Sequence, residues 1–168
     1  MSYAETYRRI YSLEPEYGSV NHGSGIVPRL LGHYSSVLDV GCGDGAFLRM
    51  MDCPGVGVDI AGTGPNVINC DATQGLPFAD GEFDLVTSFD FLEHIREDDL
   101  DFLISEMGRV GNRMIHRIAT HESEQHGMIL HETVKPQGWW ISKIRDVTGL
   151  PFARTKDPTM IGFGDIPL

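Results

Sequence analysis

The residues best suited to chemistry are a glycine-rich loop and an acidic residue some way after it. The loop DVGCGDG, residues 39–45, comes directly after the apolar pair Val37-Leu38, and Asp59 ends the next apolar run. Glycines let a strand turn sharply, and they leave no Cβ between the backbone N–H groups and a ligand. An acid about 20 residues further on can accept hydrogen bonds from ribose hydroxyls. The spacing therefore predicts a nucleoside-binding site.

Alternating strand and helix patterns surround this loop. We expect strands at 36–40, 56–60, 67–70, 83–88 and 112–119, and helices at 3–13, 26–33, 45–52, 91–96, 98–110 and 138–148. Such alternation is typical of a parallel sheet with helices on both faces. Two short β-like runs between 152 and 163 predict a closing antiparallel hairpin. The expected fold is therefore a three-layer α/β/α, Rossmann-like, doubly wound sheet that is mostly parallel, with an antiparallel C-terminal hairpin.

The acidic residues fall where such a sheet binds ligands. Open parallel sheets hold ligands at the carboxyl ends of their strands. The loop follows the first expected strand, Asp59 ends the second, Asp71 follows the third, and Phe89-Asp90-Phe91 follow the fourth. Four strand ends that agree are a stronger signal than one glycine motif.

These residues together resemble the class I methyltransferases that depend on S-adenosylmethionine (SAM). VLDVGCGDG, residues 37–45, is similar to that family's first motif. FDLV at 83–86, followed by LEHI at 92–95, is similar to its fourth-strand region. The resemblance covers roughly residues 35–120 and implies an enzyme that uses SAM and releases S-adenosylhomocysteine.

The resemblance also implies roles for individual residues. Gly41, Cys42 and Gly43 would pass their backbone against the methionine and ribose parts of SAM, and Asp39 would organise the ammonium group, directly or through water. Asp59 would bind the ribose hydroxyls.

The remaining implied cofactor residues belong to the adenine and methionine ends. Ile60 would lie against the adenine face, and Asp71 with the Ala72 backbone would contact the adenine edge. Ser88 and Phe89 would close the methionine pocket.

A dinucleotide is the rival ligand for the loop. Dinucleotide folds use G-x-G-x-x-G around a pyrophosphate, whereas the spacing here is G-x-G-x-G, with Asp44 where phosphates would be repelled. The cationic SAM suits an acidic loop better.

The methyl acceptor is expected beside a histidine-rich insertion, THESEQHGMILHET at 120–133. An oxygen or nitrogen acceptor that carries a proton needs a general base. His131 is the first choice, with His121 and His126 behind it, although an exposed polar loop is an equal interpretation for any one of them. His94 is a further candidate base, for which an orienting role is favoured. Histidine and carboxylate are also metal ligands, but no spacing fixes a metal site, so none is predicted.

Aromatic residues flank both ends of the core. One of Trp139 and Trp140 is expected to pack on the sheet, and the other is a candidate wall for the acceptor, although structural roles for both are favoured. Tyr11, Tyr17 and His22 lie in a segment that often forms a lid in the resembled family; ordinary surface and core roles are favoured for them.

The composition argues against a nucleic-acid-binding, membrane-spanning or disulfide-rich protein. The net charge of −11 leaves few cations for a nucleic-acid surface. No apolar run is as long as the ~20 residues of a membrane span, and no signal peptide is visible. The three cysteines form no C-x-x-C pair, which disfavours a disulfide framework and indicates a cytoplasmic protein.

We therefore expect one domain, residues 1–168, that methylates an O or N atom of a small molecule such as a sugar or specialised metabolite. Its segments would be a helical cap (1–34), a cofactor core (35–120), an acceptor-side loop (121–137) and a last helix with hairpin (138–168). The alternative is a non-catalytic SAM-binding regulatory or partner subunit. Because little chain is left for a lid, a second subunit is another way to complete the pocket. The apolar tail 160–168 would support a homodimer or form an edge strand.

Overall fold

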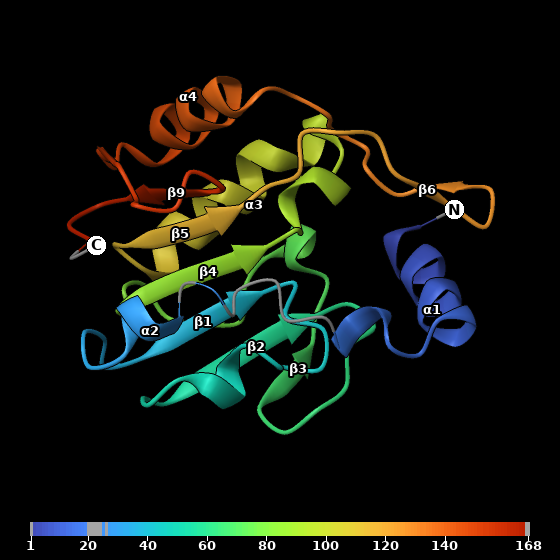
Figure 1. The fold of residues 1–168 in the computed structure, drawn as a ribbon, viewed down its shortest axis with the longest axis horizontal. Coiled ribbons are helices and arrows are strands. Elements are labelled where there is room, and N and C mark those ends of the chain that lie inside the picture. The colour runs from blue at the N-terminus through green and yellow to red at the C-terminus, as the bar shows by residue number, and fades with distance from the viewer. Residues whose placement is uncertain (1, 20–24, 26, 167–168) are drawn as a thin grey trace.

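A seven-stranded sheet forms the centre of the computed structural model, which describes residues 2–19, 25 and 27–166 (Figure 1). The strand order is β3-β2-β1-β4-β5-β9-β8. The five parallel strands are β1 (Val37–Val40), β2 (Gly55–Asp59), β3 (Val67–Asn69), β4 (Leu85–Phe89) and β5 (Met114–Arg117). β9 (Met160–Phe163) runs antiparallel to β5, and β8 (Phe152–Ala153) runs antiparallel to β9. The mostly parallel sheet with an antiparallel C-terminal hairpin is confirmed.

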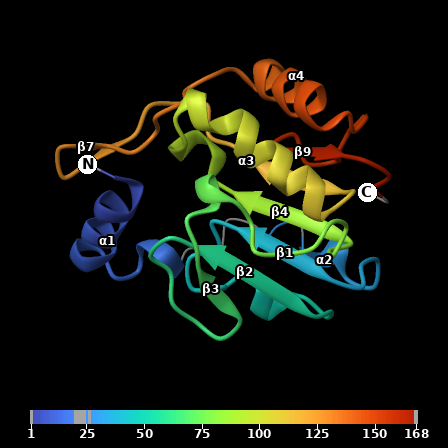
Figure 2. The same cartoon turned by 180° about the vertical axis from the view of Figure 1, so that it is seen from behind.

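Helices cover both faces of the sheet, as expected. α3 (Glu97–Val110) and α4 (Gln137–Thr148) pack on one face, where Leu103 and Ile144 join one hydrophobic cluster with Val86 (Figure 2). The other face is covered more thinly, by the short α2 (Val27–Leu30) and by the segment that contains Phe47. The three layers are therefore unequal in thickness.

The spacing of apolar residues explains why α3 is a helix. Leu100, Leu103, Ile104 and Met107 are buried on one face, at the i, i+3, i+4, i+7 positions of a helical stripe. Acidic residues fill its first turn at 97–99, where they stabilise the positive end of the helix dipole.

α1 (Tyr3–Leu13) lies apart from both faces. It begins with a capping box in which Ser2 and Glu5 bond each other's backbone N–H groups. Figures 1 and 2 both show it beyond the carboxyl ends of the parallel strands, beside the hairpin of β6 (Glu124–Gln125) and β7 (Met128–Ile129). Nε2 of His126 lies 2.8 Å from Oε1 of Glu14, which joins the hairpin to the end of α1. This part of the chain is therefore placed at the ligand-binding edge of the sheet.

Two predicted helices are wrong. Residues 45–52 form turns and the 3-10 helix η2 (Leu48–Met50), because Gly45 has a φ of 79° and Pro54 disfavours helix at the preceding residue. Too few residues remain between them for a stable α-helix. Residues 91–96 hold only the 3-10 helix η4 (Leu92–His94), since Ile95 is already extended.

The apolar tail also differs from its prediction. β9 is an interior strand that pairs with β5 and β8, so it is not an edge strand, and Met160, Ile161 and Phe163 are buried. The homodimer stays a prediction, and residues 167–168 of the tail lie outside the described part of the chain. Within the described residues, every helix is too short or too polar to cross a lipid bilayer.

Candidate active site

A cavity of about 650 Å³ opens at the carboxyl ends of the parallel strands. It is lined by α1, the 3-10 helix η1 (Tyr17–Ser19), the glycine loop, the residues after β2, β3, β4 and β5, and the histidine-rich insertion. Its volume lies in the range of small-molecule and cofactor sites, ~300–1,000 Å³. The segments that the sequence singled out therefore meet around one cavity.

The glycine loop and Asp59 form a single hydrogen-bonded unit. The Asp59 carboxylate accepts N–H groups from Gly43 at 2.9 Å, Ala61 at 2.8 Å and Gly62 at 2.6 Å. The Tyr11 hydroxyl, at 3.4 Å, is its weakest donor. Asp59 is thus held rigidly at the cavity wall, and the tyrosine contact is the one that a ligand hydroxyl can replace most easily.

The glycines let other segments approach the loop closely. Gly41 has a φ of 76°, and a Cβ there would collide with the Phe91 ring; a Cβ on Gly43 would collide with the carbonyl of Gly18. Cys42 is buried at the cavity wall, where its Sγ lies 3.6 Å from the Gly43 carbonyl. The Phe91 ring and the Gly18 backbone therefore occupy the space that side chains at these two positions would need.

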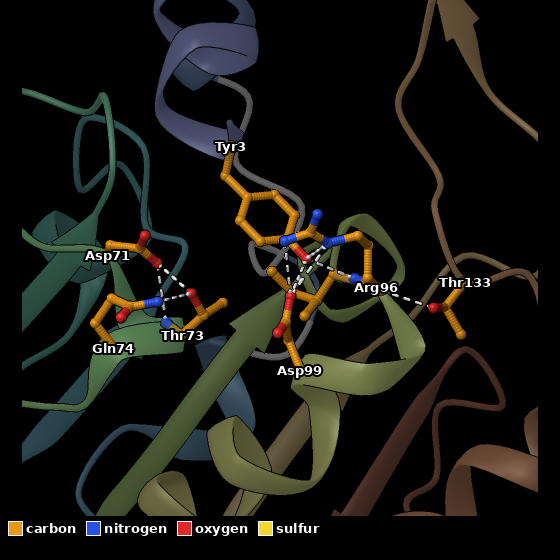
Figure 3. A network of polar contacts seen from close by, with 8 residues as sticks. Tyr3, Asp71, Thr73, Gln74, Arg96, Asp99 and Thr133 are labelled. Carbon is orange, nitrogen blue, oxygen red and sulfur yellow. Dashed lines mark hydrogen bonds and ion pairs between the residues drawn. The ribbon is translucent and has the colours of Figure 1, made fainter. Parts of the chain in front are cut away.

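Asp71 lines the cavity together with Ile60 and Ala72. It caps the 3-10 helix η3 (Ala72–Gln74), where its Oδ1 accepts from the Thr73 N–H at 3.1 Å and the Thr73 hydroxyl at 2.6 Å (Figure 3). Its side chain is therefore fixed in orientation.

Two predicted cofactor residues lie behind the cavity wall. Asp39 is 3% exposed and accepts the Thr87 hydroxyl at 2.8 Å, and burial raises the pKa of its carboxyl to about 7. The Ser88 hydroxyl is fully buried and bonds Nδ1 of His116 at 2.8 Å, so the expectation that its side chain faces the methionine pocket is wrong. Side chains alternate along a strand, and Ser88 points away from the cavity. Phe89 lines the cavity, and its ring packs on Phe47, 4.8 Å between centroids.

A face of tyrosines on α1 covers the cavity. Tyr3, Tyr7 and Tyr11 recur at four-residue spacing and line it together with Tyr17 of η1. Burial raises the pKa of Tyr17 to about 12 and that of Tyr7 and Tyr11 further, so these phenols stay neutral. Tyr11 and Tyr17 therefore lie at the cavity wall, and their role as a lid stays a prediction. His22 lies outside the described residues.

The first turn of α1 is fastened to the start of α3. The Tyr3 hydroxyl donates to Asp99 at 2.8 Å and accepts the Arg96 backbone N–H at 2.8 Å (Figure 3). The Arg96 guanidinium also lies 4.7 Å from the Tyr3 ring centroid. With the His126–Glu14 contact, this network holds both ends of the tyrosine face over the cavity.

The opposite end of the cavity brings Glu93, His94 and His131 together. The ring centroids of His94 and His131 are 4.9 Å apart, and Tyr7 lies edge-on to His94. Burial raises the pKa of Glu93 to about 8 and lowers that of His94 to about 4. The sequence pointed to both histidines; the buried Glu93 was missed as a site residue.

Of the other residues proposed for the acceptor site, only His121 lies at the cavity. His121 is exposed at the cavity rim, its ring 5.3 Å from that of His131. His126 is held by Glu14, as described above. Trp140 is buried in the core and Trp139 packs edge-on to it, between Lys135 and Lys143, so the candidate acceptor wall is wrong.

The charges around the cavity favour a cationic ligand over a dinucleotide, although the expected repulsion of phosphates by Asp44 is not the reason. Asp44 pairs with Arg49 at 3.2 Å, so its charge is compensated. A pyrophosphate site needs an α-helix N-terminus after the loop, and here a 3-10 turn follows instead. The cavity wall carries one arginine, Arg117, and five carboxylates besides the buried Glu93, whose raised pKa favours its neutral form: Glu14, Glu16, Asp59, Asp71 and Asp90.

This fold and this acid-lined cavity define a Rossmann-like domain suited to a cationic nucleoside cofactor. Residues 38–113 match the family model described as a methyltransferase domain. No curated protein sequence matches the chain.

Similar solved structures agree in fold. A SAM-dependent methyltransferase from Aquifex aeolicus is 17% identical with a TM-score of 0.61, over 97% of each chain. The 1,6-didemethyltoxoflavin-N1-methyltransferase of Burkholderia thailandensis, solved with 1,6-didemethyltoxoflavin and S-adenosylhomocysteine, is 14% identical with a TM-score of 0.66, over 96% of this chain and 88% of that one. A Haloferax volcanii methyltransferase complex with the activator Trm112 is 17% identical with a TM-score of 0.64, over 92% and 79%.

Residues 38–113 are therefore similar to a methyltransferase domain, and the chain shares the fold of solved SAM-dependent methyltransferases.

Proposed function

We propose that the protein methylates an oxygen or nitrogen atom of a small molecule, with sugars and specialised metabolites as the first acceptors to test. The observation that carries this proposal is that one cavity of about 650 Å³ is lined both by Asp59 and by His94, His121 and His131. The four tyrosines narrow access to it, which favours a small acceptor over a nucleic acid. We also propose a cytoplasmic location, which agrees with three free cysteines.

The cofactor end holds groups that match SAM. SAM supplies a methyl group on a sulfonium, which makes the transfer a displacement at carbon. Asp59 would accept the ribose hydroxyls, with Ile60, Asp71 and Ala72 around the base. Gly41, Cys42 and Gly43 would pass along the ribose and methionine parts. Asp39 would act on the ammonium group from behind the loop, through water.

The residues at the acceptor end bind, orient and take up a proton. His131 is the proposed general base. Its Nδ1 lies 2.5 Å from the His121 carbonyl, which can only accept, so the neutral ring carries its proton on Nδ1 and a lone pair on Nε2. His94 is oriented in the same way, because its Nδ1 lies 2.8 Å from the Leu130 carbonyl and so carries the proton. His121 stays a second candidate base at the rim.

Formation of S-adenosylhomocysteine in an acceptor screen tests the proposal. The screen begins with sugars and small phenols, and it compares the wild type with His131→Ala. We expect the variant to bind SAM normally and to transfer methyl groups roughly 10²–10⁴-fold more slowly. His33→Ala is the control, because His33 is exposed outside the cavity. Full activity of His131→Ala would contradict the base assignment.

The alternative class, a non-catalytic SAM-binding partner subunit, is distinguished by the same screen. Such a protein would bind SAM and S-adenosylhomocysteine yet form no methylated product with any acceptor. A second subunit that completes the pocket stays a further possibility, while α1 and the β6–β7 hairpin already contribute residues of this chain to the cavity wall.

A further inference from the structure

The acceptor end of the cavity contains a compact set of metal-ligating atoms. One ring nitrogen of His94, one of His131 and a carboxylate oxygen of Glu93 all lie within 4.8 Å of one another. Glu93 is fully buried, His94 is 8% exposed and His131 is half-buried. All three side chains line the cavity, so the space between them is reached from it.

One carboxyl oxygen of Glu93 lacks a hydrogen-bond partner among the described residues. Its Oε1 accepts the Ala119 N–H at 2.9 Å, but its buried Oε2 has no hydrogen-bond partner among the described residues. Burying a polar oxygen without a partner is costly, and far more so when it is charged. A cation at this position would supply the missing partner.

Both histidines are oriented as metal ligands are. Each Nδ1 faces a backbone carbonyl, that of Leu130 for His94 and that of His121 for His131. A carbonyl only accepts, so each Nδ1 bears the proton and each Nε2 keeps its lone pair. Metal-bound histidines commonly donate their second N–H to a carbonyl or carboxylate in this way.

We propose that Glu93, His94 and His131 bind a divalent first-row transition ion such as Zn²⁺, Mn²⁺ or Co²⁺. Two imidazoles and one carboxylate favour such ions over Mg²⁺ and Ca²⁺, which prefer oxygen ligands. Three protein ligands leave a coordination position open toward the cavity, as catalytic metal sites do.

The inference rests on the proposed methyl transfer and narrows the acceptor to a hydroxyl group. A hydroxyl oxygen at the open position would lose its proton to water more readily, because a bound cation lowers its pKa. Its lone pair would then form the new C–O bond as the C–S bond breaks, with that electron pair left on sulfur. A metal ion would occupy the lone pair that His131 otherwise offers to a proton, so the roles of ligand and base exclude each other.

Direct metal binding tests the inference without any activity measurement. Tag-free protein, freed of metals by a chelator, is titrated with Co²⁺, whose visible absorption reports its coordination, and bound metal is counted by mass spectrometry. We expect one Co²⁺ per chain, displaced by Zn²⁺. Glu93→Gln and His131→Ala should weaken Co²⁺ binding by at least about 10–100-fold, the effect of losing even an outer-shell partner.

His126→Ala is the matched control, because this histidine belongs to the same insertion and contacts Glu14 instead. It should bind Co²⁺ as the wild type does. Normal circular dichroism and SAM affinity in each variant exclude unfolding as the cause of a loss. Absence of Co²⁺ and Zn²⁺ binding, or binding unchanged in Glu93→Gln and His131→Ala, would overturn the metal site.

The two proposals fail in different ways. SAM binding and methyl transfer by metal-free protein would overturn the role of the metal in activating the acceptor and leave His131 as the base. Stoichiometric metal on the three residues with no transfer to any acceptor would support the metal site and count against the proposed function.

Discussion

Replacing Asp59 with asparagine tests the link between the glycine loop and the cofactor. The carboxylate accepts three backbone N–H groups, from Gly43 on one oxygen and from Ala61 and Gly62 on the other. Asparagine has one acceptor oxygen. If it stays with Ala61 and Gly62, its NH₂ group meets the Gly43 N–H, donor against donor. One charge-assisted hydrogen bond is lost, which lowers the free energy of unfolding by ~1.5–3 kcal/mol.

The same substitution should weaken SAM binding. A ribose hydroxyl would lose its charged acceptor, and a loss of ~1.5–3 kcal/mol corresponds to an affinity about 10- to 150-fold lower. Calorimetric titration with SAM measures it, and thermal unfolding measures the stability change. Tyr11→Phe removes only the 3.4 Å contact and should leave SAM affinity within about threefold. An Asp59→Asn variant that folds and binds SAM like the wild type would refute the reasoning.

Two further predictions concern the frame of the site. Gly41→Ala places a Cβ against the Phe91 ring at a residue with left-handed backbone (φ 76°). We expect the free energy of unfolding to fall by ~1–2 kcal/mol or more and SAM binding to be lost. Unchanged thermal unfolding would contradict this prediction. Glu106 accepts from Arg109 at 2.7 Å and from the Leu76 N–H at 2.9 Å, and Arg109 lowers the pKa of this carboxyl from 4.5 to about 2. Because the folded pKa is the lower one, its stabilisation is complete above pH 4.5 and is lost as the pH falls toward 2. Glu106→Gln should therefore lower the free energy of unfolding by ~1–3 kcal/mol at pH 7, measured by urea unfolding, and this difference from the wild type should shrink in acid. A difference that does not change with pH would contradict stabilisation by the ionised Glu106 carboxylate.

The sheet could be predicted from the sequence because its strands are apolar runs bounded by turn residues. The two helices predicted wrongly, 45–52 and 91–96, are short segments next to the site, where local chemistry overrides periodicity. In 45–52 the left-handed Gly45 and the following Pro54 leave no room for an α-helix. The β6–β7 hairpin has only two residues per strand, too few for an alternating pattern to indicate it.

The cofactor wall was easier to predict than the lid and the acceptor end. Asp59 and the loop carry a spacing signal. The Ser88 side chain faces away because side chains alternate along β4, whereas the Asp39 carboxyl is buried by its pairing with Thr87 of β4, which no local pattern indicates. The lid did have a signal, the spacing of Tyr3, Tyr7 and Tyr11 on one helical face. The burial of Glu93 had none, since only tertiary packing removes that carboxyl from water.

Parallel calorimetric titrations of the purified protein with SAM, S-adenosylhomocysteine and NAD test the central claim most directly. We predict micromolar binding of the first two at one site per chain and no binding of NAD. Binding of NAD, or absence of binding by both SAM and S-adenosylhomocysteine, would contradict the assignment of the cavity to SAM.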